Sequence, residues 1–366
     1  MGFNCGIVGL PNVGKSTLFN ALTATAAAEA ANYPFCTIEP NIGRVAVPDE
    51  RLEVCAKLAK SAKIIATQLE FVDIAGLVRG ASKGQGLGNQ FLGHLREVDA
   101  IAHIVRCFED DNIVHVEGQI DPIRDAETVE MELMLADLES VERRAGAAQK
   151  RARGGDKEAK AQLAVIEPVL AALQDGTPAR RVALPPEQQR DLKLLQLLSA
   201  KPVLYVANVD EASAASGNEL SARVAEYAAG QGADTVVVAA AIEAELAVLG
   251  DPEERRAFLG ALGLEETGLD RVIRAGYSLL DLITFLTAGP KESRAWTITR
   301  GTKAPQAAGT IHSDFEKGFI RAETIAYADF VACGGEQGAK DAGKMRLEGA
   351  EYVVSDGDVM HFRFNV

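Results

Sequence analysis

The chain alternates short apolar runs with stretches of helical periodicity over its first two thirds. Apolar runs that are typical of buried strands cover 3–8, 69–73, 101–107 and 203–207. Helical patterns lie between them, for example over 89–98. Strands that alternate with helices require crossover connections, and such connections place the strands parallel to one another. The pattern predicts an α/β fold built on one mostly parallel sheet.

A long helical segment interrupts this alternation. Two runs of apolar residues at helical spacing are separated by a glycine-containing turn at 152–156; they are Met131, Met134, Leu138 and Val141, then Leu163, Ile166, Leu170 and Leu173. They predict an antiparallel helical hairpin, inserted at about 124–198, that protrudes as an arm. Residues 143–160 include seven basic and two acidic residues. Contact with RNA or an acidic partner and a simple solvated helix face are both open interpretations.

The C-terminal part changes from helical patterning to short strands and turns at about Tyr277. Strands are expected at 296–298, 308–312 and 352–354, with a final strand at 359–364. This length suffices for one small α+β module. It contains no clustered nucleophile and base, so no catalysis is assigned to it.

A phosphate-binding motif follows the first apolar run. Residues 9–17 read Gly-Leu-Pro-Asn-Val-Gly-Lys-Ser-Thr and fit the pattern G-x-x-x-x-G-K-[ST] between a strand and a helix. Such a loop aims backbone N–H groups at phosphate, with Lys15 on the β- and γ-phosphates and the Ser16 hydroxyl on Mg²⁺. The residues expected to contact the nucleotide here are Asn12, Val13, Gly14, Lys15, Ser16 and Thr17. The motif predicts a nucleoside triphosphate site.

A second motif indicates that the nucleotide site is of the GTPase-like class. Asp73 ends an apolar run and begins the sequence Asp-Ile-Ala-Gly, the D-x-x-G pattern of GTPase-like proteins. Asp73 is expected to hold a water on Mg²⁺, and the Gly76 N–H is expected to sense the γ-phosphate. Thr37, in a loop between the two motifs, is suited to close over Mg²⁺. The predicted metal ligands are therefore Ser16, Thr37 and Asp73.

The base-recognition segment departs from the guanine pattern N-K-x-D. After the run at 203–207 the chain reads Asn208-Val209-Asp210-Glu211, so valine replaces lysine and glutamate replaces aspartate. A longer carboxylate does not keep the same two-pronged geometry to guanine. Asn208, Val209 and Glu211 are expected to line the base, with adenine or loose selectivity favoured over guanine.

The catalytic water has no obvious partner in the sequence. Leu77 stands where Ras-like proteins carry a water-orienting glutamine, so intrinsic hydrolysis should be slow. His115 is the first candidate for that role because histidine titrates near neutrality and hydrogen-bonds water. No spacing rule places it near the γ-phosphate, and an ordinary loop histidine is an equally open interpretation. Lys15, Gly76 and His115 are the expected catalytic residues.

Composition excludes several classes. The 366 residues are 47% hydrophobic, enough for a sizeable core, yet no apolar run is long enough to span a membrane and no signal peptide is expected. The five cysteines are scattered without a C-x-x-C pair, as suits a reducing cytoplasm. The net charge of −14 disfavours a lysine-coated DNA binder, and sequence-specific DNA is not an expected partner.

The motifs together resemble a known family, the YchF group or Obg-like ATPases. The resemblance rests on N-V-G-K-S-T, Y-P-F-C-T-I-E-P-N, D-I-A-G-L-V-R-G-A-S-K-G-Q-G-L-G-N-Q-F-L, the N-x-x-E element, and C-terminal segments such as D-F-E-K-G-F-I at 314–320. It covers essentially the whole chain. It implies a P-loop, GTPase-like ATPase domain over 1–277 with the hairpin inserted, and a β-grasp TGS domain over 278–366.

The resemblance also implies function. It suggests ATP preferred over GTP, Mg²⁺ as cofactor, a cytoplasmic location, and the ribosome or its large subunit as partner. Asn12 is similar to the asparagine that helps hold K⁺ in potassium-dependent relatives, so K⁺ is a further candidate cofactor. Three functions stay open: a ribosome-associated ATP-hydrolysing switch, an Obg-type GTPase with relaxed base selectivity, and a non-hydrolysing adapter.

Overall fold

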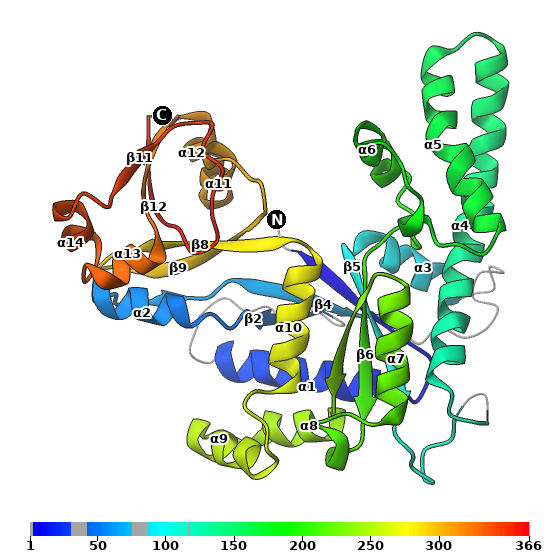
Figure 1. The fold of residues 1–366 in the computed structure, drawn as a ribbon, viewed down its shortest axis with the longest axis horizontal. Coiled ribbons are helices and arrows are strands. Elements are labelled where there is room, and N and C mark those ends of the chain that lie inside the picture. The colour runs from blue at the N-terminus through cyan, green and yellow to red at the C-terminus, as the bar shows by residue number, and fades with distance from the viewer. Residues whose placement is uncertain (1–2, 31–41, 75–86, 116–117, 366) are drawn as a thin grey trace.

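The structure, a computed structural model, describes residues 3–30, 42–74, 87–115 and 118–365. Two six-stranded sheets organise these residues, and a helical arm projects from one of them (Figure 1). The first sheet has the strand order β2-β4-β1-β5-β6-β7, and the second has the order β11-β10-β12-β8-β9-β3. The mostly parallel α/β fold, the inserted hairpin and the C-terminal α+β part are all confirmed.

The first sheet carries the predicted nucleotide motifs. Its strands are β1 (Asn4–Val8), β2 (Ile42–Ala46), β4 (Gln68–Asp73), β5 (Ala100–Cys107), β6 (Val203–Val209) and β7 (Asp234–Val238). All neighbouring pairs are parallel except β2 with β4. Every residue of β5 and β6 is buried, which explains their near-continuous apolar sequence, because helices cover both faces of a parallel sheet.

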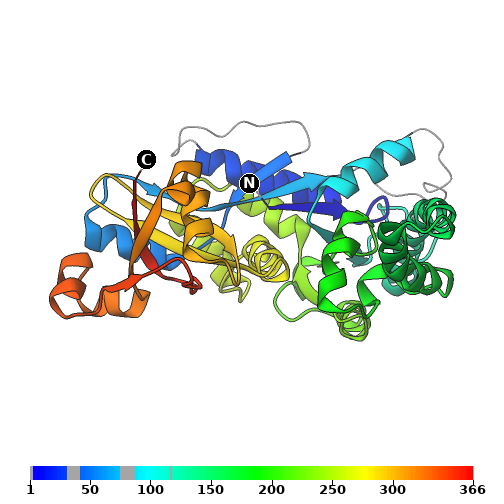
Figure 2. The same ribbon diagram turned by 90° about the horizontal axis from the view of Figure 1, so that it is seen from above.

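Two groups of helices enclose this sheet. Their bounds are α1 (Lys15–Ala30), α3 (Leu87–Glu97), α7 (Glu219–Gly230), α8 (Ala240–Val248), α9 (Pro252–Ala261) and α10 (Gly268–Leu279). α1 packs on β1, β2 and β4, and α10 packs on β5, β6 and β7. α7 packs on β6 and β7 and against the start of α4, so helices surround the strands when the molecule is seen from above (Figure 2). The carboxyl ends of the parallel strands therefore meet at one edge, where the motif residues lie.

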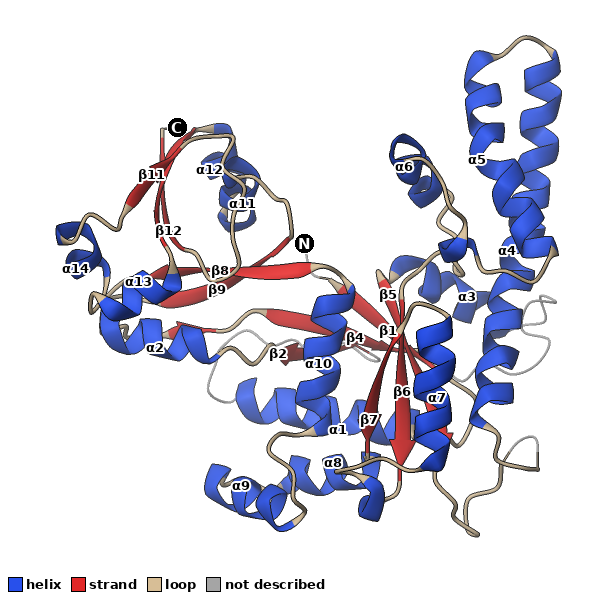
Figure 3. Cartoon of the chain, in the orientation of Figure 1, coloured by secondary structure: helices blue, strands red, loops and turns tan. Residues whose placement is uncertain are grey.

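The arm is formed by α4 (Pro122–Arg153) and α5 (Lys157–Gln174), which pack antiparallel and extend beyond the sheet (Figure 3). Asp156 caps α5 by accepting hydrogen bonds from the backbone of Glu158 and Ala159. The arm has its own apolar cluster, which includes Val141, Val165, Ile166, Val169 and Leu173, and the short helix α6 (Pro186–Leu194) adds Leu192 to it. Across the described ranges, no helix combines the length and apolarity needed to cross a membrane.

The second sheet lies mainly in the C-terminal part. Its strands are β8 (Leu282–Ala288), β9 (Ser293–Thr299), β10 (Phe319–Ile325), β11 (Arg346–Glu348), β12 (Val359–Phe364) and the short β3 (Ile64–Ile65). The helices α11 (Ala304–Ile311), α12 (Ser313–Lys317), α13 (Tyr327–Ala332) and α14 (Glu336–Asp341) connect them. The final strand at 359–364 is confirmed, but two other expectations are wrong.

The segment 308–312, expected as a strand, belongs to the helix α11. Pro305 stands in its first turn, and the alanines at 304, 307 and 308 are fully buried against the sheet. Small side chains let the helix lie close to the strands. This packing stabilises a helix in a segment whose alternating sequence pattern predicted a strand. The expected strand at 352–354 is reduced to a single bridge between Lys303 and Val353.

One segment near the N-terminus packs with the C-terminal part. Helix α2 (Glu50–Ala59) and β3 lie between β2 and β4 in the chain, but β3 pairs in parallel with β9. Leu52 and Cys55 of α2 share an apolar cluster with Leu286 and Phe330. The predicted domain limits of 277/278 and about 124–198 stay a prediction; α10 runs across residue 277, and the second sheet draws on residues outside 278–366.

Candidate functional site

The phosphate-binding loop has the predicted strand–loop–helix context. β1 ends at Val8, and α1 begins at Lys15. Gly9 and Gly14 have φ values of 153° and 99°, a backbone region that favours glycine. A Cβ on Gly14 would lie 2.2 Å from Asn208 Nδ2, and one on Gly9 would lie 2.4 Å from the Ile104 carbonyl oxygen. Both glycines are therefore required by backbone angle and by space.

Lys15 and Asp73 form the charged centre of the site. The Lys15 ammonium donates to the Leu10 carbonyl oxygen at 2.7 Å, and only 7% of the residue is exposed. Burial lowers the pKa of Lys15 to about 8, an effect that the charge of Asp73 opposes. Asp73 ends β4, whose register pairs it with Ile7 of β1.

The carboxylate of Asp73 is not fully hydrogen-bonded within the described residues. Burial raises its pKa, and the Lys15 charge opposes the shift. Its Oδ1 is buried and has no hydrogen-bond partner among the described residues. A buried polar atom in this condition is costly unless a ligand satisfies it. A cation or a cation-bound water would satisfy this oxygen.

The donor atoms present fit Mg²⁺. Ser16 is the second residue of α1 and its side chain is exposed beside the loop, so a hydroxyl and a carboxylate are available as hard oxygen ligands. Mg²⁺ commonly takes only one or two protein ligands and completes its shell with water and phosphate. No cluster of three or more His, Cys, Asp or Glu side chains suited to a metal occurs within the described residues. Thr37 and Gly76 lie outside the described residues.

Asn208 holds two loops of the site together. Its Nδ2 donates to the Val13 carbonyl oxygen at 2.9 Å, and its Oδ1 accepts from the Ala240 N–H at 2.9 Å. The first contact fixes the phosphate loop, and the second fixes the start of α8. Val209 is buried, whereas Glu211 is exposed at the start of a 3₁₀ turn. Val13 in the phosphate loop is buried, and Thr17 in the first turn of α1 is exposed.

The segment that contains His115, the first candidate for aligning the catalytic water, contacts the phosphate loop. No spacing rule in the sequence predicted this contact. The Asn12 side chain, on a residue with φ of 62°, donates to the Val114 carbonyl oxygen at 3.1 Å. The adjacent His115 is 8% exposed, and its Nε2 lies 2.7 Å from Asp125 Oδ2. The segment before it is held by the fully buried Arg106, whose guanidinium donates to three loop carbonyls at 108, 110 and 113.

Arg106 and Asp125 were not predicted from the sequence. Arg106 had a signal, because it is a charged residue inside an otherwise apolar strand. Asp125 had none, because an acidic residue in the first turn of a helix is common. Their partners lie within ten residues in the chain, but the hydrogen bonds depend on the conformation of the loop after β5, which periodicity does not predict.

Together, the glycine loop at the N-terminus of α1, the carboxylate at the end of β4 and the strand order define a P-loop nucleoside triphosphatase domain of the GTPase-like class. Residues 4–137 match the family model described as "50S ribosome-binding GTPase". Residues 282–365 match the model YchF-GTPase_C, described as "Protein of unknown function (DUF933)". The chain belongs to the YchF family, as its relatives show.

Two curated relatives carry the name "Ribosome-binding ATPase YchF". The one from Haemophilus influenzae is 60% identical over 366 residues, and the one from Bacillus subtilis is 58% identical over 368 residues, each covering 100% of both chains. The solved structure of the Schizosaccharomyces pombe YchF GTPase is similar with a TM-score of 0.89 and 39% identity, over 99% of this chain and 98% of that one. A GTP-binding protein from Pyrococcus horikoshii, 20% identical with a TM-score of 0.59, shares the fold.

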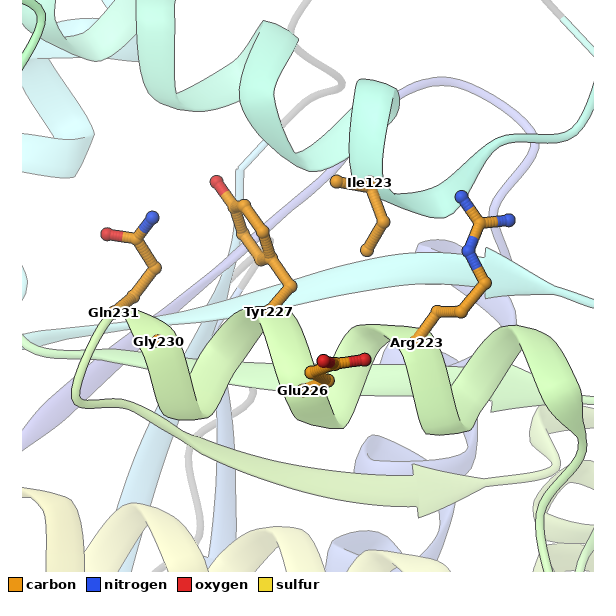
Figure 4. A pocket seen from close by; sticks show the side chains of 6 residues that line it. All are labelled: Ile123, Arg223, Glu226, Tyr227, Gly230 and Gln231. Atoms are coloured by element: carbon orange, nitrogen blue, oxygen red, sulfur yellow. The ribbon is translucent and has the colours of Figure 1, made fainter.

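A separate hollow lies between α7 and the start of α4. It is lined by Ile123, Arg223, Glu226, Tyr227, Gly230 and Gln231 (Figure 4). None of these residues belongs to the phosphate loop or to the ends of the strands that carry the motifs. The hollow is therefore separate from the loop that is predicted to bind the nucleotide.

Proposed function

We propose that this chain is a ribosome-associated switch that binds Mg²⁺·ATP at the phosphate loop and hydrolyses it slowly. The observation that carries the proposal is the buried Lys15 beside a carboxylate whose Oδ1 has no partner in the described part of the chain. The name of the relatives, at 60% and 58% identity over full length, supports both ATP hydrolysis and the ribosome. A cytoplasmic location follows from such a role.

The metal would be held by Ser16, Thr37 and Asp73. Mg²⁺ bound there would neutralise charge that develops on the β- and γ-phosphates. Lys15 would leave the Leu10 carbonyl oxygen and donate to the phosphates instead, which would compensate its buried charge. The Gly76 N–H would contact the γ-phosphate.

For the base, we propose ATP over GTP. Val209 offers no ammonium and Glu211 replaces the guanine-binding aspartate, so the contacts that distinguish guanine are missing. The alternative, a GTPase with relaxed selectivity, is favoured by the Schizosaccharomyces pombe relative, which is named a GTPase. Competition binding with ATP and GTP decides between them. A strong preference for GTP would refute the substitution argument.

For catalysis, we propose His115 as the water-aligning residue, supported by the contact between Asn12 and Val114 at the phosphate loop. His115→Ala should lower kcat and leave ATP affinity intact. K⁺ is the second candidate; because the Asn12 amide nitrogen donates to Val114, its Oδ1 is the atom that a cation would take. Replacing K⁺ with Na⁺ should then slow turnover. If neither change alters the rate, both assignments fail.

For the ribosome, we propose that the arm supplies contacts. All seven basic residues within 143–160 are exposed. Five of their side chains form neither an ion pair nor a hydrogen bond with any described residue: Arg143, Lys150, Arg153, Lys157 and Lys160. Cationic side chains on a protruding arm suit RNA phosphates. Single-turnover hydrolysis with and without ribosomes separates a hydrolysing switch from an adapter, because an adapter would bind ribosomes without turning ATP over in either condition.

A further inference from the structure

A buried acid–base pair links the phosphate loop to the base of the arm. His115 Nε2 and Asp125 Oδ2 are 2.7 Å apart, and their side chains are 5% and 2% exposed. Val114, the residue before His115, accepts the hydrogen bond from Asn12 in the phosphate loop. We propose that Asp125 is a positioning residue that orients His115 for ATP hydrolysis. This inference rests on the proposed role of His115.

The chemistry of the contact fixes the imidazole ring. A neutral histidine that hydrogen-bonds a carboxylate through Nε2 carries its proton on that nitrogen, so the lone pair is on Nδ1. Asp125 therefore selects the tautomer of His115 and limits its rotation. A histidine that aligns or deprotonates water needs both.

The surroundings of Asp125 indicate that its main partner is His115. Burial raises the pKa of Asp125, and the hydrogen bond from His115 is the largest opposing effect. Its Oδ1 has no hydrogen-bond partner among the described residues, and the guanidinium of Arg124 lies 4.0 Å away. The neighbouring Asp121 instead caps α4 and pairs with Arg223 at 3.2 Å beside the hollow of Figure 4.

Another buried carboxylate of the same helix provides a contrast. Asp137 is 1% exposed, as is Asp125, but it accepts hydrogen bonds from the Leu198 N–H and from the N–H and hydroxyl of Ser199. Those three bonds fasten the arm to the chain that returns from it. Asp137 is thus a structural carboxylate, whereas Asp125 is hydrogen-bonded to His115, the residue next to the one that contacts Asn12 in the phosphate loop.

The test compares four variants of the full chain: His115→Ala, Asp125→Asn, Asp125→Ala and Asp137→Asn. We expect Asp125→Ala to lower kcat for Mg²⁺·ATP about tenfold or more, with KM within about twofold of wild type, as for other residues that orient a functional histidine. The kcat of Asp125→Asn should lie between those of wild type and Asp125→Ala, because asparagine keeps a hydrogen-bond acceptor but loses the negative charge. Asp137→Asn should lower thermal stability while kcat per folded molecule stays at the wild-type value.

A second readout reports on the ring itself. The ¹⁵N NMR spectrum of the five histidines, with the His115 signal identified from its loss in His115→Ala, should show the Nε2–H form in the wild type. That pattern should change in Asp125→Ala and persist in Asp137→Asn. Equal kcat in wild type and Asp125→Ala, a higher kcat in Asp125→Ala, or an unchanged tautomer would overturn the inference. If His115→Ala itself retains wild-type kcat, the proposed role of His115 fails instead.

Discussion

Nucleotide binding should be coupled to protonation of Lys15. Burial lowers the pKa of this ammonium from 10.5 to about 8. Phosphate oxygens next to the ammonium favour its charged form, so binding should return the pKa to its ordinary range or above. Because the bound state then holds more protons than the free state, binding takes up a proton at alkaline pH.

The magnitude follows from the shift. At pH 8 about half of the Lys15 side chains are neutral, so binding should take up about half a proton, rising to about 0.9 proton at pH 9. Affinity for Mg²⁺·ATP should correspondingly be about tenfold lower at pH 9 than at pH 7, a difference of about 1.4 kcal/mol. Cation binding at Asp73 changes the number of bound protons in the opposite direction, because a cation that binds the carboxylate displaces a proton from it.

Calorimetric titration at each pH, in two buffers with different ionisation enthalpies, measures the number of protons exchanged. Lys15→Arg is the matched control: it keeps the positive charge but does not titrate in this range, so the uptake should vanish even if affinity drops. Lys15→Ala should abolish binding. Zero uptake by the wild type between pH 8 and 9, or the same uptake by Lys15→Arg, would refute the reasoning.

Three other predictions concern the loop, the base and the arm. Gly14→Ala should abolish ATP binding, checked by equilibrium titration, because its Cβ would lie 2.2 Å from Asn208 Nδ2 at a φ of 99°. Val209→Lys with Glu211→Asp should shift the ratio of ATP to GTP affinity towards GTP by about tenfold, since one good polar contact is worth about 1–3 kcal/mol; competition binding that shows no shift contradicts this. Arg153→Glu with Lys157→Glu should weaken ribosome co-sedimentation and flatten its salt dependence, while ATP turnover without ribosomes stays unchanged.

The contiguous features could be predicted from the sequence. The phosphate loop, the strands that end at Asp73 and Val209, and the turn of the arm all depend on residues close together in the chain. Local propensity and spacing therefore carried enough information. The segment 308–312 failed because an alternating pattern over five residues also fits a short alanine-rich helix, and burial against the second sheet decided between the two.

The distant contacts could not be predicted in this way. β3 has two residues, too few for any periodicity, and its partner β9 lies more than 200 residues further along the chain. The pair of His115 and Asp125 depends on where β5 delivers its following loop relative to the start of α4. In each of these contacts, hydrogen-bonding groups of one element pair with those of another. Patterns in a single sequence do not show which elements lie side by side in the fold.

These distant contacts determine how the second sheet is attached. The chain leaves β2 at Ala46, passes through α2 and β3, and returns along β4 to Asp73. Within this segment, β3 joins the second sheet, and Arg51 of α2 forms an ion pair with Asp356 at 2.7 Å. The C-terminal part is therefore anchored to the strand that ends at Asp73, the proposed metal ligand, as well as through its own N-terminal connection. A cation bound to Asp73, as proposed, would hold β4 at the end opposite to the one that leads back to β3.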